Sequence, residues 1–330
     1  MRFSGIFGLL LLPVLIALNP VRVSATGARH PAETRVTVSA GGKGDFQTIQ
    51  QAVDHAPPEG NGRLIIAIEP GLYRERVVIP QDRPRVTLLG LGANPSDTII
   101  TYDMSAAAAG GTFFSSTVDV QGTQFETANL TIQNSFGPGS QAVALSVHSD
   151  RAVVRDCRLL GWQDTLYAAS GRQLYKDTYI EGAVDFIFGN ARAVFEACEI
   201  RSIGSGYITA QSRVAPAGAT GFVFTHCRLT AGEKVTRVYL GRPWRPYARV
   251  VFLFTEMGAH IEPEGWIEWH PGETHSLDSA WYAEYESSGP GARALRRDPH
   301  TKFLTARQAE AFAAAHFLAA PDSWRPTDLR

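Results

Sequence analysis

The sequence predicts an all-β protein, a right-handed single-stranded parallel β-helix with short capping helices. Two observations predict it. Short apolar or β-branched segments, each followed by Gly or a turn, recur at intervals of roughly 20 to 30 residues. Helical periodicity is nearly absent between Val86 and Phe254. Short strands at this spacing without crossover helices also fit a β-sandwich, so the register of the repeat has to decide between the two folds.

The register of two neighbouring segments favours stacked coils. The segment "DCRLLGWQD" at 156–164 aligns with "DTYIEGAVD" at 177–185: both begin and end in Asp, both have Gly in the sixth position, and Leu159 falls on Ile180. Sandwich strands run antiparallel and give a repeat no reason to keep equivalent residues in equivalent places, whereas solenoid coils stack directly on one another. Stacked coils lie about 4.8 Å apart, which is the ordinary spacing of strands.

The same alignment extends along the chain to three more segments, "NLTI" at 129–132, "ACEI" at 197–200 and "HCRL" at 226–229. It places the three cysteines on the rungs of one interior ladder, with Thr178 on the rung between the first two. The cysteines contain no C-x-x-C pair, so we predict no zinc site. We expect them to be free, buried and unreactive.

Both ends of the β-helix have candidate capping segments. The segment 45–57 puts Ile49, Ala52 and Val53 on one helical face and ends at a proline, which suits a short helix that closes the first coil. Near the other end, Thr305 is placed to N-cap a helix over 306–317, whose Ala and Phe residues would pack along the outside of the coils.

The N-terminal segment and the overall charge limit the class of protein. Residues 1–25 combine Arg2, an apolar run and a small-residue site, which predicts a signal peptide followed by one β-helix domain over 26–330. The apolar run is shorter than a spanning helix requires, so we expect a secreted protein without a membrane anchor. Lys plus Arg number 31 against 32 for Asp plus Glu, which leaves no basic surplus for binding nucleic acid.

Two carboxylates stand out because the stacked register brings them together. Asp164 and Asp185 occupy the same position of successive coils, so their side chains are expected within near-contact range. Two carboxyl groups at that distance cannot both ionise easily, so one pKa is expected to rise while the other stays low. Such a split provides an acid and a base at one pH. A stacked polar ladder with a purely structural role is the alternative for an isolated pair.

The residues around the two acids favour a catalytic site. Gln163 directly precedes Asp164, and Gln141 falls on the adjacent coil, so two amide donors lie beside the acids. Further along, "GRPWRPYARVVF" supplies Arg242 and Trp244, and a guanidinium can hold one carboxylate ionised through a bidentate pair. The set offers an anionic nucleophile, a neutral acid, two oxyanion donors and an aromatic wall.

This combination resembles the pectinesterases, or pectin methylesterases, which are carbohydrate esterases with a right-handed parallel β-helix fold. The resemblance covers nearly all of the chain that follows the predicted signal peptide. It is carried by the order and spacing of the strings "GDFQTIQQAV", "GLYRERV", "TFFSSTV", "NLTIQNS", "QAVAL", "GWQDTLY", "YIEGAVDFIFGNA", "ITAQ", "GRPWRPYARVVF", "EGW" and "AEYESSGPGA".

The resemblance implies a role for each matching residue. Asp185 is similar to the family's nucleophile and Asp164 to its proton donor, with Gln163 and Gln141 as stabilisers of the transition state. The implied substrate is the methyl ester of galacturonate in pectin, that is, in methylated homogalacturonan. The residues expected to contact this substrate are Arg242, Trp244, Thr112, Gln141, Phe186 and Trp266.

The resemblance implies no metal and no organic cofactor, and the expected assembly is a monomer. The expected location is extracellular, or periplasmic if the source is a Gram-negative bacterium. Two other functions fit a carboxylate pair on a β-helix: a glycoside hydrolase of the polygalacturonase type, and a non-catalytic pectin-binding β-helix. The chain lacks the Gly-His-Gly and Arg-Ile-Lys strings of the polygalacturonases, and its glutamines suit an oxyanion better than an oxocarbenium ion.

Overall fold

The computed structural model describes residues 1–2, 33–55, 62–292 and 294–326. The predicted signal peptide at 1–25 therefore lies outside the described residues except for Met1 and Arg2. Within the described part, no helix has the length and apolar character needed to cross a membrane.

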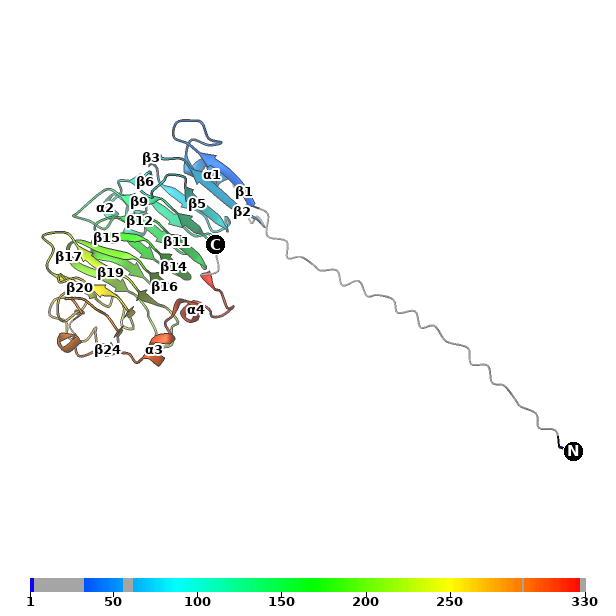
Figure 1. Ribbon diagram of the computed structural model, residues 1–330. Coiled ribbons are helices and arrows are strands. Elements are labelled where there is room, and N and C mark those ends of the chain that lie inside the picture. The colour runs from blue at the N-terminus through cyan, green and yellow to red at the C-terminus, as the bar shows by residue number, and fades with distance from the viewer. Residues whose placement is uncertain (3–32, 56–61, 293, 327–330) are drawn as a thin grey trace. The chain divides into compact units, whose positions relative to one another are not determined.

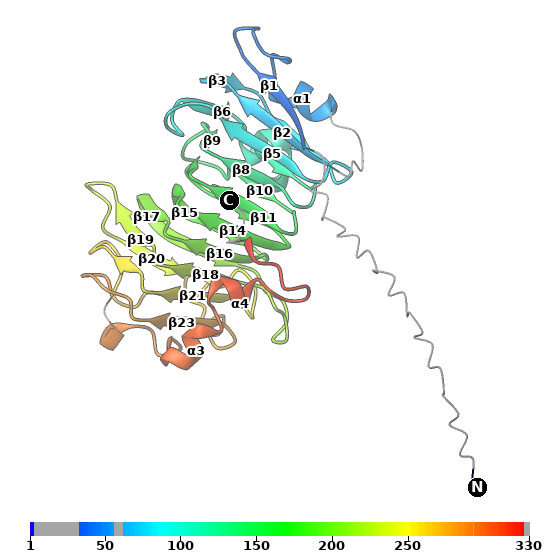
Figure 2. The same ribbon diagram turned by 45° about the vertical axis from the view of Figure 1, so that its right-hand side comes forward.

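The chain winds into a right-handed single-stranded parallel β-helix, as the sequence predicts (Figures 1 and 2). Its strands stack in three columns, and every pairing between named strands is parallel. The first column is one sheet: β1 (Glu33–Val38), β2 (Arg63–Ile68), β5 (Val86–Gly90), β8 (Glu126–Ala128), β11 (Ala152–Arg155), β14 (Arg172–Lys176), β16 (Arg192–Glu196), β18 (Gly221–Thr225), β21 (Arg249–Leu253), β23 (Trp281–Tyr285) and β24 (Lys302–Phe303).

Two long strands join the other two columns into a second sheet. β15 (Tyr179–Gly189) and β17 (Glu199–Gln211) cross the bend between these columns and pair in both of them. The second column also contains β3 (Gly71–Arg74), β6 (Thr98–Tyr102), β9 (Thr131–Asn134), β12 (Arg158–Leu160), β19 (Arg228–Ala231) and β22 (Glu256–Met257). The third contains β4 (Val77–Ile79), β7 (Val118–Val120), β10 (Leu145–Val147), β13 (Leu166–Ala168) and β20 (Val238–Gly241).

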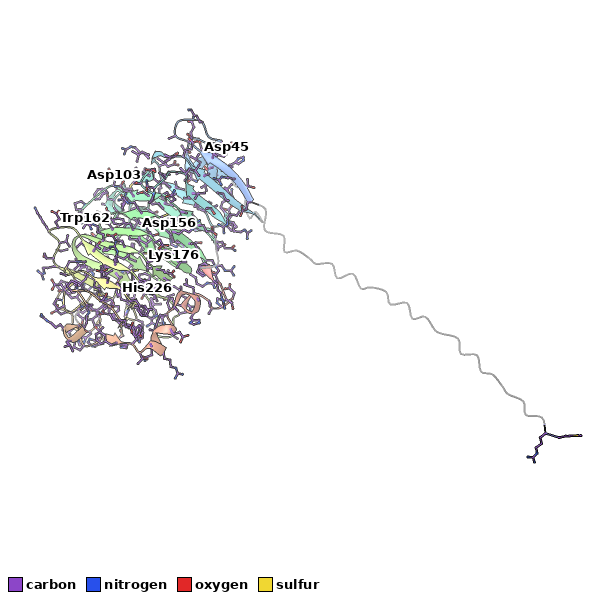
Figure 3. All side chains as sticks on the ribbon, viewed as in Figure 1. Asp45, Asp103, Asp156, Trp162, Lys176 and His226 are labelled. Carbon is purple, nitrogen blue, oxygen red and sulfur yellow. The ribbon has the colours of Figure 1, made fainter. Side chains whose placement is uncertain are left out.

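A residue with a left-handed backbone conformation directly follows several strands of the first column, and the chain turns there into the second column. These residues are Asn129, Asp156, Asp177, Ala197 and His226, with φ between 47° and 54°. Asn and Asp tolerate this conformation better than most residues, which explains three of the five. Figure 3 shows Asp156 and His226 at different levels of the stack.

The next residue of each coil points inward and forms the ladder predicted from the cysteines. Cys157, Thr178, Cys198 and Cys227 are all buried, and the three thiols are free. Each of these four side chains lies one coil away from the one before it, because the strands that follow them pair in register, as Leu159 does with Ile180. Burial raises the pKa of Cys157 to about 11, so the expectation of unreactive thiols agrees with the structure.

Short helices cover the ends and one outer face. α1 (Ile49–His55) buries Ile49, Ala52 and Val53 at the first coil, as predicted. α2 (Ala106–Ala109) and the 3-10 turn η1 (Thr112–Phe114) lie in the loop between β6 and β7, and η2 (Ala294–Arg296) lies between β23 and β24.

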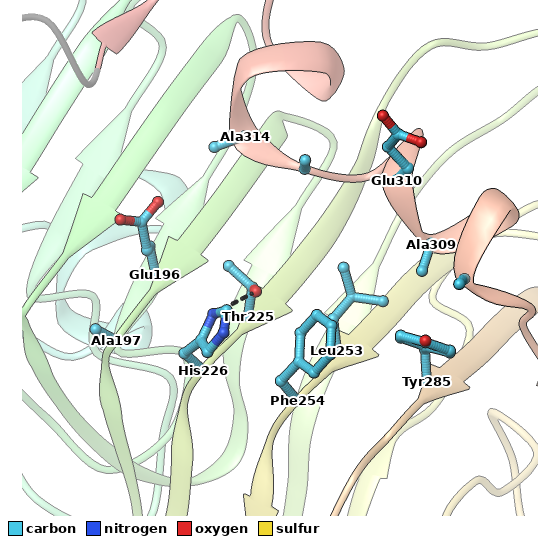
Figure 4. A pocket seen from close by; sticks show the side chains of 12 residues that line it. Glu196, Ala197, Thr225, His226, Leu253, Phe254, Tyr285, Ala309, Glu310 and Ala314 are labelled. Atoms are coloured by element: carbon cyan, nitrogen blue, oxygen red, sulfur yellow. Dashed lines mark hydrogen bonds between the residues drawn. The ribbon is translucent and has the colours of Figure 1, made fainter.

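The helix predicted over 306–317 is two helices, α3 (Ala306–Glu310) and α4 (Ala314–Phe317). Thr305 caps α3 in a capping box with Gln308, and Ala313 is extended, which breaks the helix. This break lets Phe317 pack on the outer face of the first sheet, against residues such as Val194 and Val223. A groove of about 540 Å³ remains between α3, α4 and that sheet (Figure 4).

Candidate active site

The two acids occupy equivalent left-handed positions on successive coils. Asp164 has a φ of 63° and Asp185 a φ of 49°, and the backbone N–H of Asp164 donates to the carbonyl of Val184 at 3.0 Å. A parallel bridge between Gln163 and Val184 fixes the register. The two carboxyl groups therefore project from the same turn of the β-helix, one coil apart.

The glycine in the sixth position of each repeat has a steric cause. In the second repeat, a Cβ on Gly182 would lie 2.2 Å from the Cβ of Phe186. In the first, a Cβ on Gly161 would lie 2.6 Å from the Oγ1 of Thr165. The residue that follows each Asp therefore folds over the glycine, and this close approach requires a residue without a side chain.

Arg242 forms a bidentate pair with Asp185. Its Nε donates to Oδ1 at 3.0 Å and its Nη2 to Oδ2 at 2.6 Å. Both side chains are largely buried, with 16% of the Arg242 side chain and 8% of the Asp185 side chain exposed. Asp164 forms no such pair with any residue that the structure describes, so the two carboxyl groups have different environments.

The different environments separate the two pKa values. Burial and the negative charge of Asp185 raise the pKa of Asp164 well above its ordinary value. Burial also raises the pKa of Asp185, but Arg242 opposes that rise. The sequence argument expected the second pKa to stay low, and burial makes that part wrong. The order still holds: Asp185 ionises first, and its charge keeps the proton on Asp164.

Two amide side chains lie next to the acids. Gln141 and Gln163 are on adjacent coils, because the backbone N–H of Ala142 donates to the carbonyl of Gln163 at 3.0 Å. Both side chains line the same pocket as the acids. Because they are half-buried and border this pocket, they can donate to an oxygen atom that enters it.

The pocket has a volume of about 210 Å³ and an aromatic wall. The Phe188 ring stacks on Tyr167 with centroids 4.7 Å apart, and Trp244 lies 5.9 Å from Phe188. The lining residues are Thr112, Phe113, Gln141, Gln163, Asp164, Asp185, Phe188, Ala210, Arg242, Trp244 and Trp269. One small cleft thus combines two carboxyl groups, a guanidinium, two amides and an apolar face.

Comparisons with known proteins identify the family of this chain. A sequence model of the pectinesterase family matches residues 35–321. Pectinesterase 31 of Arabidopsis thaliana is 40% identical over 307 residues, which cover 89% of this chain and 95% of that protein. The chain belongs to the pectinesterase family. It is accordingly a carboxylic ester hydrolase.

Solved structures support the same assignment. The pectin methylesterase from carrot matches with a TM-score of 0.83 and 35% identity, over 88% of this chain and 95% of that chain. A pectin methylesterase in complex with a hexasaccharide matches with a TM-score of 0.75 and 31% identity, over 88% of this chain and 97% of that chain. The parallel β-helix predicted from the repeat is therefore the fold of the family.

Two residues predicted to contact the substrate do not reach the pocket of this pectinesterase. Phe186 has no exposed surface and belongs to the interior core. Trp266 is 2% exposed and stacks on Tyr282 inside the coils, with ring centroids 3.8 Å apart. The prediction of substrate contact is wrong for both, because their side chains point into the β-helix.

Three aromatic residues of the pocket were missed: Phe113, Phe188 and Trp269. Trp266 forms only an isolated bridge and Trp269 lies in a bend outside every strand, so strand alternation gave no signal for Trp269. Phe186 and Ile187, which follow the left-handed Asp185, both belong to the interior core, so simple alternation fails here and only Phe188 lines the pocket.

The larger groove of about 540 Å³ beneath α3 and α4 is separate from this site (Figure 4). It is lined mainly by apolar groups such as Leu253, Phe254 and Ala309, with Glu196 and Glu310 at its edges. Size alone therefore does not identify the reactive pocket. Among the described residues, no group of three or more His, Cys, Asp or Glu is placed to hold a metal ion.

Proposed function

We propose that this pectinesterase removes methyl groups from galacturonate methyl esters in methylated homogalacturonan, giving pectate and methanol. The observation that carries the proposal is the unequal carboxyl pair: Asp185 is held by Arg242, while Asp164 shares its pocket without such a partner. The pectin methylesterase solved with a hexasaccharide supports a carbohydrate polymer as the substrate.

The first half of the reaction uses Asp185 as the nucleophile. Its ionised carboxylate attacks the ester carbonyl carbon, and the carbonyl oxygen becomes an oxyanion. The amides of Gln141 and Gln163 stabilise this oxyanion, a role in which one donor is worth about 3 kcal/mol. The bond to the methoxy oxygen breaks, Asp164 transfers its proton to that oxygen, and methanol leaves behind an acyl-enzyme anhydride.

The second half restores the enzyme. Asp164, now ionised, takes a proton from a water molecule that attacks the carbonyl carbon of the anhydride. The bond to the Asp185 oxygen breaks, which returns Asp185 to its ionised form and releases the galacturonate carboxyl group as the free acid. That carboxyl group then loses its proton to the solvent. The aromatic wall of Phe188 and Trp244 offers apolar surface to the sugar ring and the methyl group.

Methylated pectin tests this function against its rivals. The chain without residues 1–25 is expected to release methanol from pectin in the presence of EDTA, with no new reducing ends and no fall in viscosity. New reducing ends without methanol would identify a glycoside hydrolase of the polygalacturonase type. Binding to pectin without any product would identify a binding protein.

We also propose that residues 1–25 are removed as a signal peptide and that residues 26–330 act as an exported monomer without a membrane anchor. N-terminal sequencing of the exported protein should find its start at Thr26. Light scattering of the purified protein should give the mass of a single chain. An uncut N-terminus or a stable dimer would contradict the corresponding part.

A further inference from the structure

The guanidinium of Arg242 lies between two aromatic rings. Its Cζ is 3.9 Å from the ring centroid of Tyr207 and 4.2 Å from that of Trp269. Its Nη1 donates to the backbone carbonyl of Trp269 at 3.1 Å, while Nε and Nη2 donate to Asp185. Both faces and the polar edge of the guanidinium are thus engaged at once.

Each ring has its own support in the fold. Tyr207 lies in β17, where its backbone pairs with Val184 on one side and Tyr239 on the other. Trp269 is held by the loop that contains it. Its backbone N–H donates to Ser276 Oγ at 2.9 Å. Glu268 in turn accepts from Ser276 Oγ and, through Oε2, from the backbone N–H of Leu277 at 3.0 Å. The two rings therefore come from separate, independently anchored segments.

An arginine side chain without such contacts has many rotamers, and ordering it costs conformational entropy. Stacking on aromatic faces offsets part of this cost, most effectively where water is excluded. Only 16% of the Arg242 side chain is exposed, so this condition is met. We propose that Tyr207 and Trp269 are positioning residues, which clamp the guanidinium of Arg242 so that its polar edge faces the nucleophile Asp185.

This clamp rests on the proposed function, because it acts through Asp185. A competing role for Tyr207 is direct contact with a sugar residue. Tyr207 lines a second pocket of about 390 Å³ together with Val184, Arg237 and Tyr239. The two roles predict different kinetics: loss of a sugar contact raises KM alone, whereas loss of the clamp alters the ionisation of Asp185 and lowers kcat.

The test compares Tyr207→Leu and Trp269→Leu with Tyr207→Phe, which retains the ring. A matched control is Tyr179→Leu, which removes a similar stack, with the Arg158 Cζ 5.3 Å from the Tyr179 ring centroid, on strands outside the pocket. Both site leucine variants should lose about 5- to 30-fold in kcat at neutral pH. The acid limb of the pH profile should move upward by about 0.5 to 1 unit, because a less firmly held Arg242 stabilises the carboxylate less.

Tyr207→Phe and Tyr179→Leu should keep the wild-type profile. A higher KM with an unmoved acid limb in Tyr207→Leu would overturn the clamp in favour of a sugar contact. Unchanged kinetics in both leucine variants would overturn it as well.

A second readout separates failure of the clamp from failure of the proposed function. The Asp185 carboxyl is titrated by carbon-13 NMR in the wild type and in Tyr207→Leu, without substrate. If the wild type releases no methanol, the proposed function fails, and the NMR titration alone decides about the clamp. A higher pKa for Asp185 in the leucine variant supports the clamp, and an unchanged one overturns it.

Discussion

The repeat that revealed the fold contains two pairs of aspartates, of which the second pair lines the pocket. Asp156 and Asp177 open the two segments, and Asp164 and Asp185 close them. All four have left-handed backbones, with φ between 47° and 63°. The backbone N–H of Asp156, Asp177 and Asp164 each donates to a carbonyl of the next coil at 3.0 to 3.1 Å.

The two pairs differ in their surroundings. The Asp156 side chain is 54% exposed (Figure 3). Asp177 is also exposed. The Asp185 side chain is 8% exposed, and Asp164 is buried beside it. Water screens the first pair, whereas the charge of Asp185 acts on the buried Asp164 and the charge of Arg242 acts on both members of the second pair. Backbone geometry and residue type are therefore shared, and desolvation makes the difference.

The largest expected effect on catalysis distinguishes Asp185 from Asp177, the second aspartate of each pair. Asp185→Asn removes the nucleophile and should lower kcat for methanol release by about 10⁴-fold or more. Asp177→Asn makes the same change one turn earlier in the same coil and should leave kcat near the wild-type value. Steady-state rates of both variants on methylated pectin provide the measurement. If Asp185→Asn retained activity, Asp185 could not be the nucleophile.

The next largest effect on catalysis distinguishes Asp164 from Asp156, the first aspartate of each pair. Asp164→Asn cannot protonate methanol or accept a proton from water, so kcat should fall by about 10²- to 10⁴-fold. In the wild type, kcat/KM should rise with pH as Asp185 ionises and fall as Asp164 loses its proton. The falling limb should be absent from the residual activity of Asp164→Asn, while the exposed control Asp156→Asn keeps it. Retention of that limb in Asp164→Asn would assign it to another group.

The smallest expected effect concerns stability. Because the pKa of Asp164 is raised in the folded state, the unfolded chain loses this proton at a lower pH. The free energy of unfolding then falls as pH rises from the unfolded pKa to the folded one, by at most about 1.4 kcal/mol per pH unit. Asp164→Asn should remove this loss and be more stable than the wild type at pH 7, with little difference near pH 4.

Urea unfolding at both pH values measures this stability difference. Asp156→Asn serves as the control, because its side chain is already in contact with water and should give no pH-dependent gain. Equal stability of Asp164→Asn and the wild type at pH 7 would mean that burial of this carboxyl carries no cost. The proposed distinction between the two pairs would then have to be abandoned.

Much of the fold was predictable from the sequence because the repeat is a local property. A parallel β-helix pairs each coil with its sequence neighbour, so the alignment of Leu159 with Ile180 is also their contact in space. The inward cysteine ladder follows from the same alignment. The break between α3 and α4 was not predictable in this way, since Phe317 packs on strands of distant coils.

The candidate site was predictable in part. Resemblance and register together placed Asp164, Asp185, Gln163 and Gln141 in one pocket, because they follow the repeat. Phe186 and Trp266 were misplaced, because the direction of a side chain near a left-handed turn depends on backbone angles that a residue pattern does not contain. Tyr207 escaped notice because its partner, Arg242, comes from another part of the chain.

The sequence by itself determined the β-helix, the one-coil spacing of the two acids and the residue types around them, since all three depend on order along the chain. Only the tertiary structure decided which aspartates are buried, which aromatic rings enclose Arg242 and which of the two acids ionises first. These properties depend on exclusion of water and on contacts between distant segments. The free energy of a charged group is set by those surroundings, and they exist only in the folded chain.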